Sequence, residues 1–232
     1  MRTADLVRLY PRLFHMAAPS SWEAIDQHGL LSTEALLDLF EVPEPRRTEL
    51  IEKRRSKTEV LEHPVHGTAE VRDQIPLSEA KLKQALGGTM SVEQWLRLLN
   101  ARVFFWLQPE RLQRMLTARA YRNRGHLVLT VNTDALLSHV GLEVVSLSRI
   151  NSGSTAYKAA PRGPDTFVPI GEYLHPSRRR ATRSASDVAE LCVQGCVPEI
   201  RNVLIEAELI APHGERTVIW SADGDGQKGS GS

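Results

Sequence analysis

Residues 103–107 read VFFWL, an apolar run without a polar residue. Such a run is typical of a strand that is buried on both faces, so it predicts a strand near the centre of a sheet. Pro109 follows at the start of a helix expected over residues 110–121, because proline is favoured in the first helical turn. The middle of the chain therefore combines a core strand with a helix.

Short strands and short helices follow one another on both sides of this run. Strands are expected over residues 13–16, 127–131, 142–147, 167–170, 188–193, 203–210 and 217–221, and helices over 33–40, 46–57, 78–86, 91–100 and 133–139. Another helix is expected to begin near Ser20, which has capping-box spacing to Glu23, and to stop at Gly29. The elements lack the regular alternation of a parallel α/β protein, which predicts an α+β fold.

The expected organisation is one domain over residues 1–222. Residues 62–76 show no periodicity and are expected to form an exposed excursion, the first part of a loop and helical insertion over 62–100. Residues 223–232 are rich in Gly and Ser, which predicts a flexible tail.

Composition and charge exclude several classes of protein. The chain is 41% apolar and 25% charged, as expected of a globular protein, and its 29 basic residues nearly cancel its 28 acidic ones. A net charge of +1 provides no global attraction for nucleic acid or membrane, so such a partner would need a local patch. No apolar stretch is long enough to span a membrane, and residues 1–20 lack the apolar centre of a secretory signal, which predicts a cytoplasmic protein without a membrane partner.

Common catalytic and metal-binding motifs are absent or out of context. Gly224, Gly226 and Gly229 match the dinucleotide fingerprint, but the chain ends three residues later and leaves no room for the helix that this motif requires. Cys192 and Cys196 would lie about 13 Å apart along a strand, too far for a disulfide and poorly placed to complete a zinc site with histidines. No metal is expected.

Two clusters of arginines stand out. Arg54 and Arg55 belong to the charged segment 46–57, where a solvated helix face is the usual interpretation. Arg178, Arg179 and Arg180 lie in a loop without an acidic residue, and they are candidates for contacts with nucleic acid phosphates.

Single polar residues within apolar strands form a second class of candidates. His15 stands between Phe14 and Met16, where a hydrogen-bonded core histidine is the common case. Glu190 lies in VAELCV, where a buried carboxylate is costly unless it has a partner. The alternative for Glu190 is a charge on an edge strand that prevents aggregation.

Four blocks of sequence, in this order, resemble the DarT-type (DUF4433-like) ADP-ribosyltransferases, which transfer ADP-ribose from NAD to a DNA base. They are LFHMAAPSSWEAIDQHGLLS (13–32), IEKRRSKTEVL (51–61), ARVFFWLQPERLQRML (101–116) and VAELCVQGCVPEI (188–200). The resemblance implies the ADP-ribosyltransferase fold, a curved and split mixed sheet that grips NAD, with a helical insertion.

The resemblance also implies roles for single residues. Glu190 would be the catalytic glutamate and Arg55, or alternatively Arg54, the catalytic arginine. The NAD-binding positions would be His15, Ser21, Gly29, Leu30, Arg54 and one of Phe104 and Phe105. NAD would be the co-substrate and nicotinamide a product, DNA or RNA the acceptor and an antitoxin a partner.

The sequence departs from the pattern of this family at three places. Ala17 replaces a threonine, Ser21 stands where asparagine is common, and the aromatic run has no tyrosine. Three alternatives therefore stay open: an NAD glycohydrolase or protein ADP-ribosyltransferase, a non-catalytic module that binds a nucleotide or a partner, and an RNA 2'-phosphotransferase, for which the sequence offers few clustered histidines.

Overall fold

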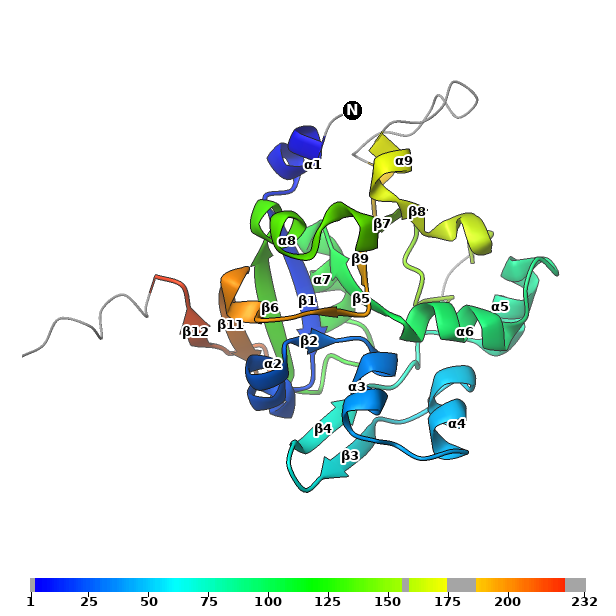
Figure 1. The fold of residues 1–232 in the computed structure, drawn as a ribbon, viewed down its shortest axis with the longest axis horizontal. Coiled ribbons are helices and arrows are strands. Elements are labelled where there is room, and N and C mark those ends of the chain that lie inside the picture. The colour runs from blue at the N-terminus through cyan, green and yellow to red at the C-terminus, as the bar shows by residue number, and fades with distance from the viewer. Residues whose placement is uncertain (1–2, 156–158, 175–186, 224–232) are drawn as a thin grey trace, which may run out of the picture.

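An antiparallel sheet of eight strands forms the middle of the molecule (Figure 1). The computed structural model describes residues 3–155, 159–174 and 187–223. The strands run in the order β12, β11, β6, β1, β5, β9, β7, β8. Their bounds are β1 (Arg12–Ala17), β5 (Arg102–Trp106), β6 (His126–Asn132), β7 (Val145–Ser148), β8 (Val168–Pro169), β9 (Glu190–Gln194), β11 (Leu204–Ile210) and β12 (Arg216–Ser221). The chain is thus a mixed α+β single domain, and β5 has the central place that its apolar run predicted.

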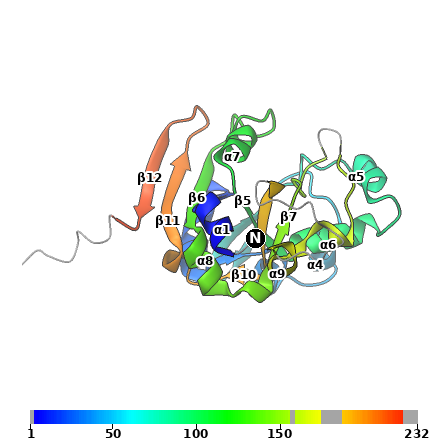
Figure 2. The ribbon, with the colours of Figure 1, turned by 90° about the horizontal axis from the view of Figure 1, so that it is seen from above.

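Two small sheets and several helices complete the domain. The small sheets pair β2 (Leu30–Leu31) with β10 (Cys196–Val197), and β3 (Glu59–His63) with β4 (Gly67–Val71). The helices are α1 (Thr3–Leu9), α2 (Trp22–His28), α3 (Thr33–Leu39), α4 (Arg46–Glu52), α5 (Glu79–Leu86), α6 (Val92–Asn100), α7 (Pro109–Leu116), α8 (Thr133–Val140) and α9 (Ile170–Leu174). Figure 2 shows β11 and β12 at one end of the molecule and α5 and α6 at the other.

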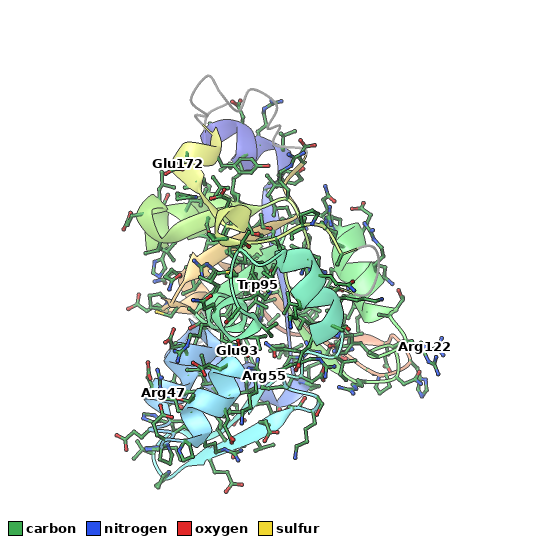
Figure 3. The ribbon with its side chains drawn as sticks, turned by 90° about the vertical axis from the view of Figure 1, so that its right-hand side faces the viewer. Arg47, Arg55, Glu93, Trp95, Arg122 and Glu172 are labelled. Carbon is green, nitrogen blue, oxygen red and sulfur yellow. The ribbon has the colours of Figure 1, made fainter. Side chains whose placement is uncertain are left out.

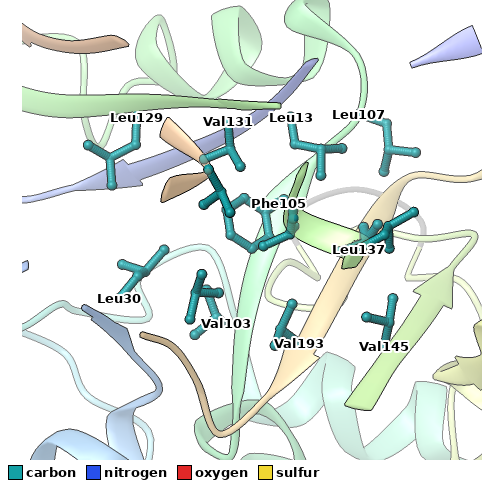
Figure 4. Close-up of a cluster of buried hydrophobic side chains, with 14 of the residues drawn as sticks. Leu13, Leu30, Val103, Phe105, Leu107, Leu129, Val131, Leu137, Val145 and Val193 are labelled. Carbon is teal, nitrogen blue, oxygen red and sulfur yellow. The ribbon is translucent and has the colours of Figure 1, made fainter. Parts of the chain in front are cut away.

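The main core lies on one face of the sheet, because alternate residues of a strand point to opposite faces. Val103 and Phe105 of β5 pack there against Leu13 of β1 and Leu137 of α8 (Figure 4). Phe104 and Trp106 point to the other face and are only half-buried. The prediction that VFFWL is buried on both faces was therefore wrong for alternate residues.

The segment 62–76, expected to be an exposed excursion, contains the end of β3 and all of β4, which together form a hairpin. Leu61 and Ala69 are opposite each other in this hairpin, and both are buried against α3 and α4. Only every second residue of the hairpin contributes to this small core, and polar residues and histidines lie between. That dilution explains why the strands left no clear apolar pattern in the sequence.

Helix boundaries matched the expected ones with three exceptions, one of which is that α7 ends at Leu116 and not at residue 121. The capping box of Ser91 and Gln94 starts α6 as predicted. The other expected capping box is absent, because the Ser20 hydroxyl donates to Glu70 and α2 starts only at Trp22. The helix expected over 46–57 ends at Glu52, so the double arginine that follows lies outside it.

The sheet opens between β1 and β5. Among the described residues, pairing between these two strands is confined to Phe14 and Trp106. By contrast, β1 pairs with β6 along its whole length, and β5 does the same with β9. Beyond that single pair the facing edges of β1 and β5 need other hydrogen-bond partners, and side chains supply two of them, as described below.

Two sequence expectations concern single features of the chain. Both cysteines are free thiols, Cys192 being buried and Cys196 partly buried. No helix within the described ranges has the length and apolar character needed to cross a bilayer.

Candidate functional site

A cavity of about 310 Å³ lies where the sheet opens between β1 and β5. Its walls come from β1, α2, β5, β9, the segment after β4 and the loop after β7. The cavity brings together seven of the residues expected at a site: His15, Ser21, Gly29, Leu30, Arg55, Phe104 and Glu190. These residues are as much as 175 positions apart in the chain, so only the fold places them on one cavity.

Glu190 is the acidic group of the cavity. Its strand β9 lies between β5 and β7, so the edge-strand alternative is wrong. The residue is only 4% exposed, and its carboxylate accepts two hydrogen bonds from Ser152, from the backbone N–H (3.1 and 3.2 Å to the two oxygens) and from the hydroxyl (2.7 Å). Burial raises the pKa of Glu190 to about 7, against the effects of Ser152, Arg111 and Arg162, which favour the charged form.

The loop that carries Ser152 is itself fixed. Arg162 donates from its two terminal nitrogens to the carbonyl oxygens of Ser152 (3.0 Å) and Ser154 (3.1 Å). The same guanidinium lies 5.6 Å from the centre of the Trp95 ring, a distance that allows a cation–π contact. A buried arginine thus holds the loop, and the loop holds Glu190.

His15 lies at the edge of β1 where pairing with β5 stops. Its Nδ1 is 2.9 Å from the carbonyl oxygen of Phe104, which accepts only, so Nδ1 carries the proton and donates. Burial lowers the pKa of His15 to about 4, so the ring is neutral at pH 7. The other nitrogen, Nε2, is then a hydrogen-bond acceptor on a residue that lines the cavity.

Arg55, which is labelled in Figure 3, lines the cavity, but protein groups already occupy much of its guanidinium. Nε donates to the Arg72 carbonyl (3.0 Å), Nη1 to the Leu50 carbonyl (2.5 Å) and Nη2 to Asn100 Oδ1 (3.0 Å). Burial lowers the pKa of Arg55 to about 10, which leaves the group charged at neutral pH. Arg55 therefore fastens the segment after β4 to α4 and α6, and few of its five N–H groups are left for a ligand.

Arg54 binds backbone groups of the segment after β4 and does not reach the cavity. It donates to the carbonyl oxygens of Leu77 and Ile75, the latter at 3.3 Å, and it is not part of the cavity wall. The double arginine thus secures the chain that follows β4. The alternative assignment of Arg54 as a ligand-binding residue does not fit this position.

Arg72 is a cavity residue that the sequence did not single out. Its Nη1 donates to the Met16 carbonyl (3.1 Å), and its guanidinium lies 5.3 Å from the centre of the Tyr121 ring. The neighbouring Asp73 carboxylate is held by the Tyr121 hydroxyl (2.8 Å) and by Arg124 (2.8 Å). The only hint in the sequence was the mixture of charges around residues 70–73, inside a segment interpreted as a loop.

Gly29 provides the tight turn between α2 and β2. Its φ of +80° lies in the region that favours glycine, and a Cβ would come within 2.5 Å of the Val197 carbonyl oxygen. The following Leu30 pairs with Val197, so this turn binds the start of the chain to the segment after β9. A glycine is required here by both backbone conformation and space.

The remaining expected site residues lie elsewhere. Phe105 is fully buried in the main core, so Phe104 is the aromatic residue of the pair that lines the cavity. Arg178, Arg179 and Arg180 lie outside the described residues. Within the described ranges no group of three or more His, Cys, Asp or Glu side chains is arranged to hold a metal ion.

Comparisons with known proteins place the chain in a family. Neither the comparison with curated proteins nor that with solved structures finds a match. A model described as a family of unknown function, DUF7002, matches residues 11–204, which is most of the chain. The chain therefore belongs to the DUF7002 family.

Proposed function

We propose that this protein is an NAD-dependent ADP-ribosyltransferase that uses a nucleobase of DNA or RNA as acceptor. The observation that carries the proposal is that Glu190 and His15, which are 175 positions apart, line one cavity at the place where the sheet opens. A split sheet with a glutamate and a histidine on the cleft is what the resemblance to the DarT-type family implies for NAD binding. The four resembling blocks supply most of the cavity wall.

The donors and acceptors of the cavity suit NAD as co-substrate. NAD supplies the ADP-ribosyl group and releases nicotinamide. His15 Nε2 is an acceptor for a ribose hydroxyl, and Phe104 offers an aromatic face to the nicotinamide ring. A volume of about 310 Å³ is at the lower end for ligand sites, so the cavity would hold one nucleoside half with the rest of the molecule toward the opening.

Glu190 would act on the charge that develops during transfer. As the bond to nicotinamide breaks, positive charge grows at the anomeric carbon, and a fixed carboxylate stabilises that charge more than it stabilises the substrate. The bonds from Ser152 keep the carboxylate in one orientation before substrate arrives. The acceptor nitrogen then forms the new bond to the anomeric carbon and releases its proton to water.

Arginines near the cavity favour a nucleic acid as the acceptor. Arg111, Arg114, Arg119 and Arg122 lie on α7 and the turn after it, and among the described residues none of them forms an ion pair with an acid. Arg122 projects from the edge of the molecule (Figure 3). Met115 and Tyr121, from the same segment, line the cavity. These arginines would hold the phosphate backbone while a base enters the cavity.

The direct test is release of nicotinamide. The purified protein is incubated with NAD and with single-stranded DNA, RNA or a protein extract, and nicotinamide and the mass of each acceptor are measured. Glu190→Gln should lower the rate about 100- to 1,000-fold, the usual effect of removing one electrostatic transition-state group. Glu172→Gln, the same change on an exposed residue of α9, is the matched control.

The outcomes separate the alternatives. A mass increase on protein only, or free ADP-ribose without any acceptor, would identify a protein transferase or an NAD glycohydrolase. Growth arrest on expression, relieved by a second protein, would support a base-modifying toxin with an antitoxin. Nicotinamide release that is undiminished in Glu190→Gln would refute the proposal.

A non-catalytic nucleotide-binding module is the second candidate. It is favoured by the hydrogen bonds that already engage both oxygens of Glu190, and by the missing hydroxyl at Ala17. In that case calorimetry would detect nucleotide binding, and nicotinamide would not appear even after long incubation.

A further inference from the structure

A half-buried cation without an acidic partner among the described residues lies on the cavity wall next to His15. Arg72 follows β4, and its single hydrogen bond within the described residues goes to the carbonyl oxygen of Met16. Four of its five N–H groups are therefore left for other partners. Arg72 and His15 are close enough that the charge of Arg72 contributes to the low pKa of His15.

The acids near Arg72 are already engaged by other groups. Asp73 accepts from the Tyr121 hydroxyl and the Ile75 N–H at Oδ1, and from Arg124 at Oδ2. Glu70 accepts from the Ser20 hydroxyl. Neither carboxylate lies within ion-pair distance of Arg72 in the described part of the chain.

A charge in this position is costly unless a partner offsets the loss of water. Burial lowers the pKa of Arg72, and Tyr121, Asp73 and Glu70 offset only part of that effect. The segment from Arg72 to Leu77 is nevertheless held in place, because Arg54 and Arg55 donate hydrogen bonds to the carbonyl oxygens of Arg72, Ile75 and Leu77. A cation fixed in a cavity with free donors is suited to an anion from outside the protein.

We propose that Arg72, and not Arg55, is the phosphate-binding residue of this cavity, and that it takes a nucleotide whose ribose hydroxyl donates to His15 Nε2. A guanidinium beside a neutral imidazole offers donors and an acceptor side by side, which matches the phosphate and the hydroxyl of one nucleotide. The inference rests on the proposed function for the choice of NAD as that nucleotide, and it names the group that would hold its pyrophosphate.

Calorimetry on the full chain tests this with ADP and adenosine, which differ only in the phosphates. The unmodified protein should bind ADP at least tenfold more tightly than adenosine. Arg72→Gln should weaken ADP binding about 10- to 100-fold, the value of a hydrogen bond to a charged group, and leave adenosine binding unchanged. Arg8→Gln, an exposed arginine in the last turn of α1, is the matched control and should behave as the unmodified protein.

Three results would overturn the proposal: no measurable ADP binding, equal binding of ADP and adenosine, or an Arg72→Gln variant that keeps the preference for ADP. Should Arg72→Gln fail to fold, Arg72→Lys replaces it, with a selective loss of ADP affinity expected and an equal loss for both ligands contradicting the proposal. This experiment is independent of the nicotinamide assay described above, so the two proposals can fail separately. If ADP binding depends on Arg72 but the nicotinamide assay shows no release, the transferase proposal is refuted and the phosphate site is retained.

Discussion

The two charged walls of the cavity are built differently. Glu190 on β9 has both oxygens engaged by Ser152, on a loop that Arg162 holds in turn. Arg72, after β4, has one hydrogen bond to a backbone carbonyl and no acid at ion-pair distance among the described residues. The acid is therefore oriented by the protein itself, whereas the cation keeps most of its donors for something else. The proposed phosphate site at Arg72 depends on this difference, because a ligand can be bound only through donors that the protein itself does not use.

Removing the guanidinium of Arg55, which holds the segment that carries Arg72, should have the largest effect on stability. Arg55→Met leaves the Leu50 and Arg72 carbonyls without their donor and leaves Asn100 Oδ1 with only the longer bond from Gln74 (3.5 Å), which should lower the free energy of unfolding by about 2–4 kcal/mol. Chemical denaturation of both proteins measures this. Arg54→Met, which removes bonds to two carbonyls outside the cavity, should cost less.

The opposite result would change the assignment of the two arginines. If Arg55→Met is as stable as the unmodified protein but no longer binds ADP, Arg55 itself contacts the ligand. The sequence-based prediction of a catalytic arginine at this position would then be correct, and Arg72 would lose its role.

Removing the Ser152 hydroxyl, which orients Glu190, should have a smaller effect. It should be visible mainly in how the rate of nicotinamide release depends on pH. Ser152→Ala removes the hydroxyl bond to Glu190 and leaves the backbone N–H bond in place. Because that hydroxyl favours the charged carboxylate, its loss should raise the pKa of Glu190 beyond its value of about 7 in the unmodified protein. Nicotinamide release should fall several-fold near pH 7 and recover at higher pH.

Ser152→Thr keeps the hydroxyl and should restore the original pH profile. A uniform loss of activity at every pH in Ser152→Ala would instead indicate a structural role of the loop.

The smallest effect is expected for the pH dependence of stability in the unmodified protein. Glu190 has a pKa raised from 4.5 to about 7 in the fold, so its contribution is complete below pH 4.5 and is lost as the pH rises toward 7. His15 has a pKa lowered from 6.5 to about 4, so its contribution is present above pH 6.5 and is lost as the pH falls toward 4. The two slopes oppose each other between pH 4.5 and 6.5.

Variants should expose each slope separately. Glu190→Gln should become more stable from pH 4.5 to 6.5, as the His15 contribution returns, and His15→Gln should become less stable over the same range. Denaturation at a series of pH values measures both. If stability changed with pH in the same way in both variants, at least one of the two residues would not have the shifted pKa described above.

Much of the sheet followed from local pattern, and the missed parts have physical reasons. The central place of β5 was predictable, because an apolar run without a polar residue favours a strand inside the sheet, although only alternate residues of the run are fully buried. The β3–β4 hairpin was missed because only alternate residues such as Leu61 and Ala69 pack against anything, and the rest are polar. Arg72 was missed because it follows that unrecognised hairpin. Its importance arises from neighbours such as Met16 and Tyr121, which are distant in sequence.

By itself the sequence determined the fold class, most strands, the start of α6 at its capping box and the strain-tolerant turn at Gly29, since these depend on residues that are close along the chain. Only the tertiary structure decided which polar side chains share the cavity, which of Arg55 and Arg72 keeps free donors, and why Glu190 has a pKa near 7. Hydrogen-bond partners and burial come from segments far apart in the sequence. The ionisation and the free donors of a side chain therefore depend on where the whole chain folds.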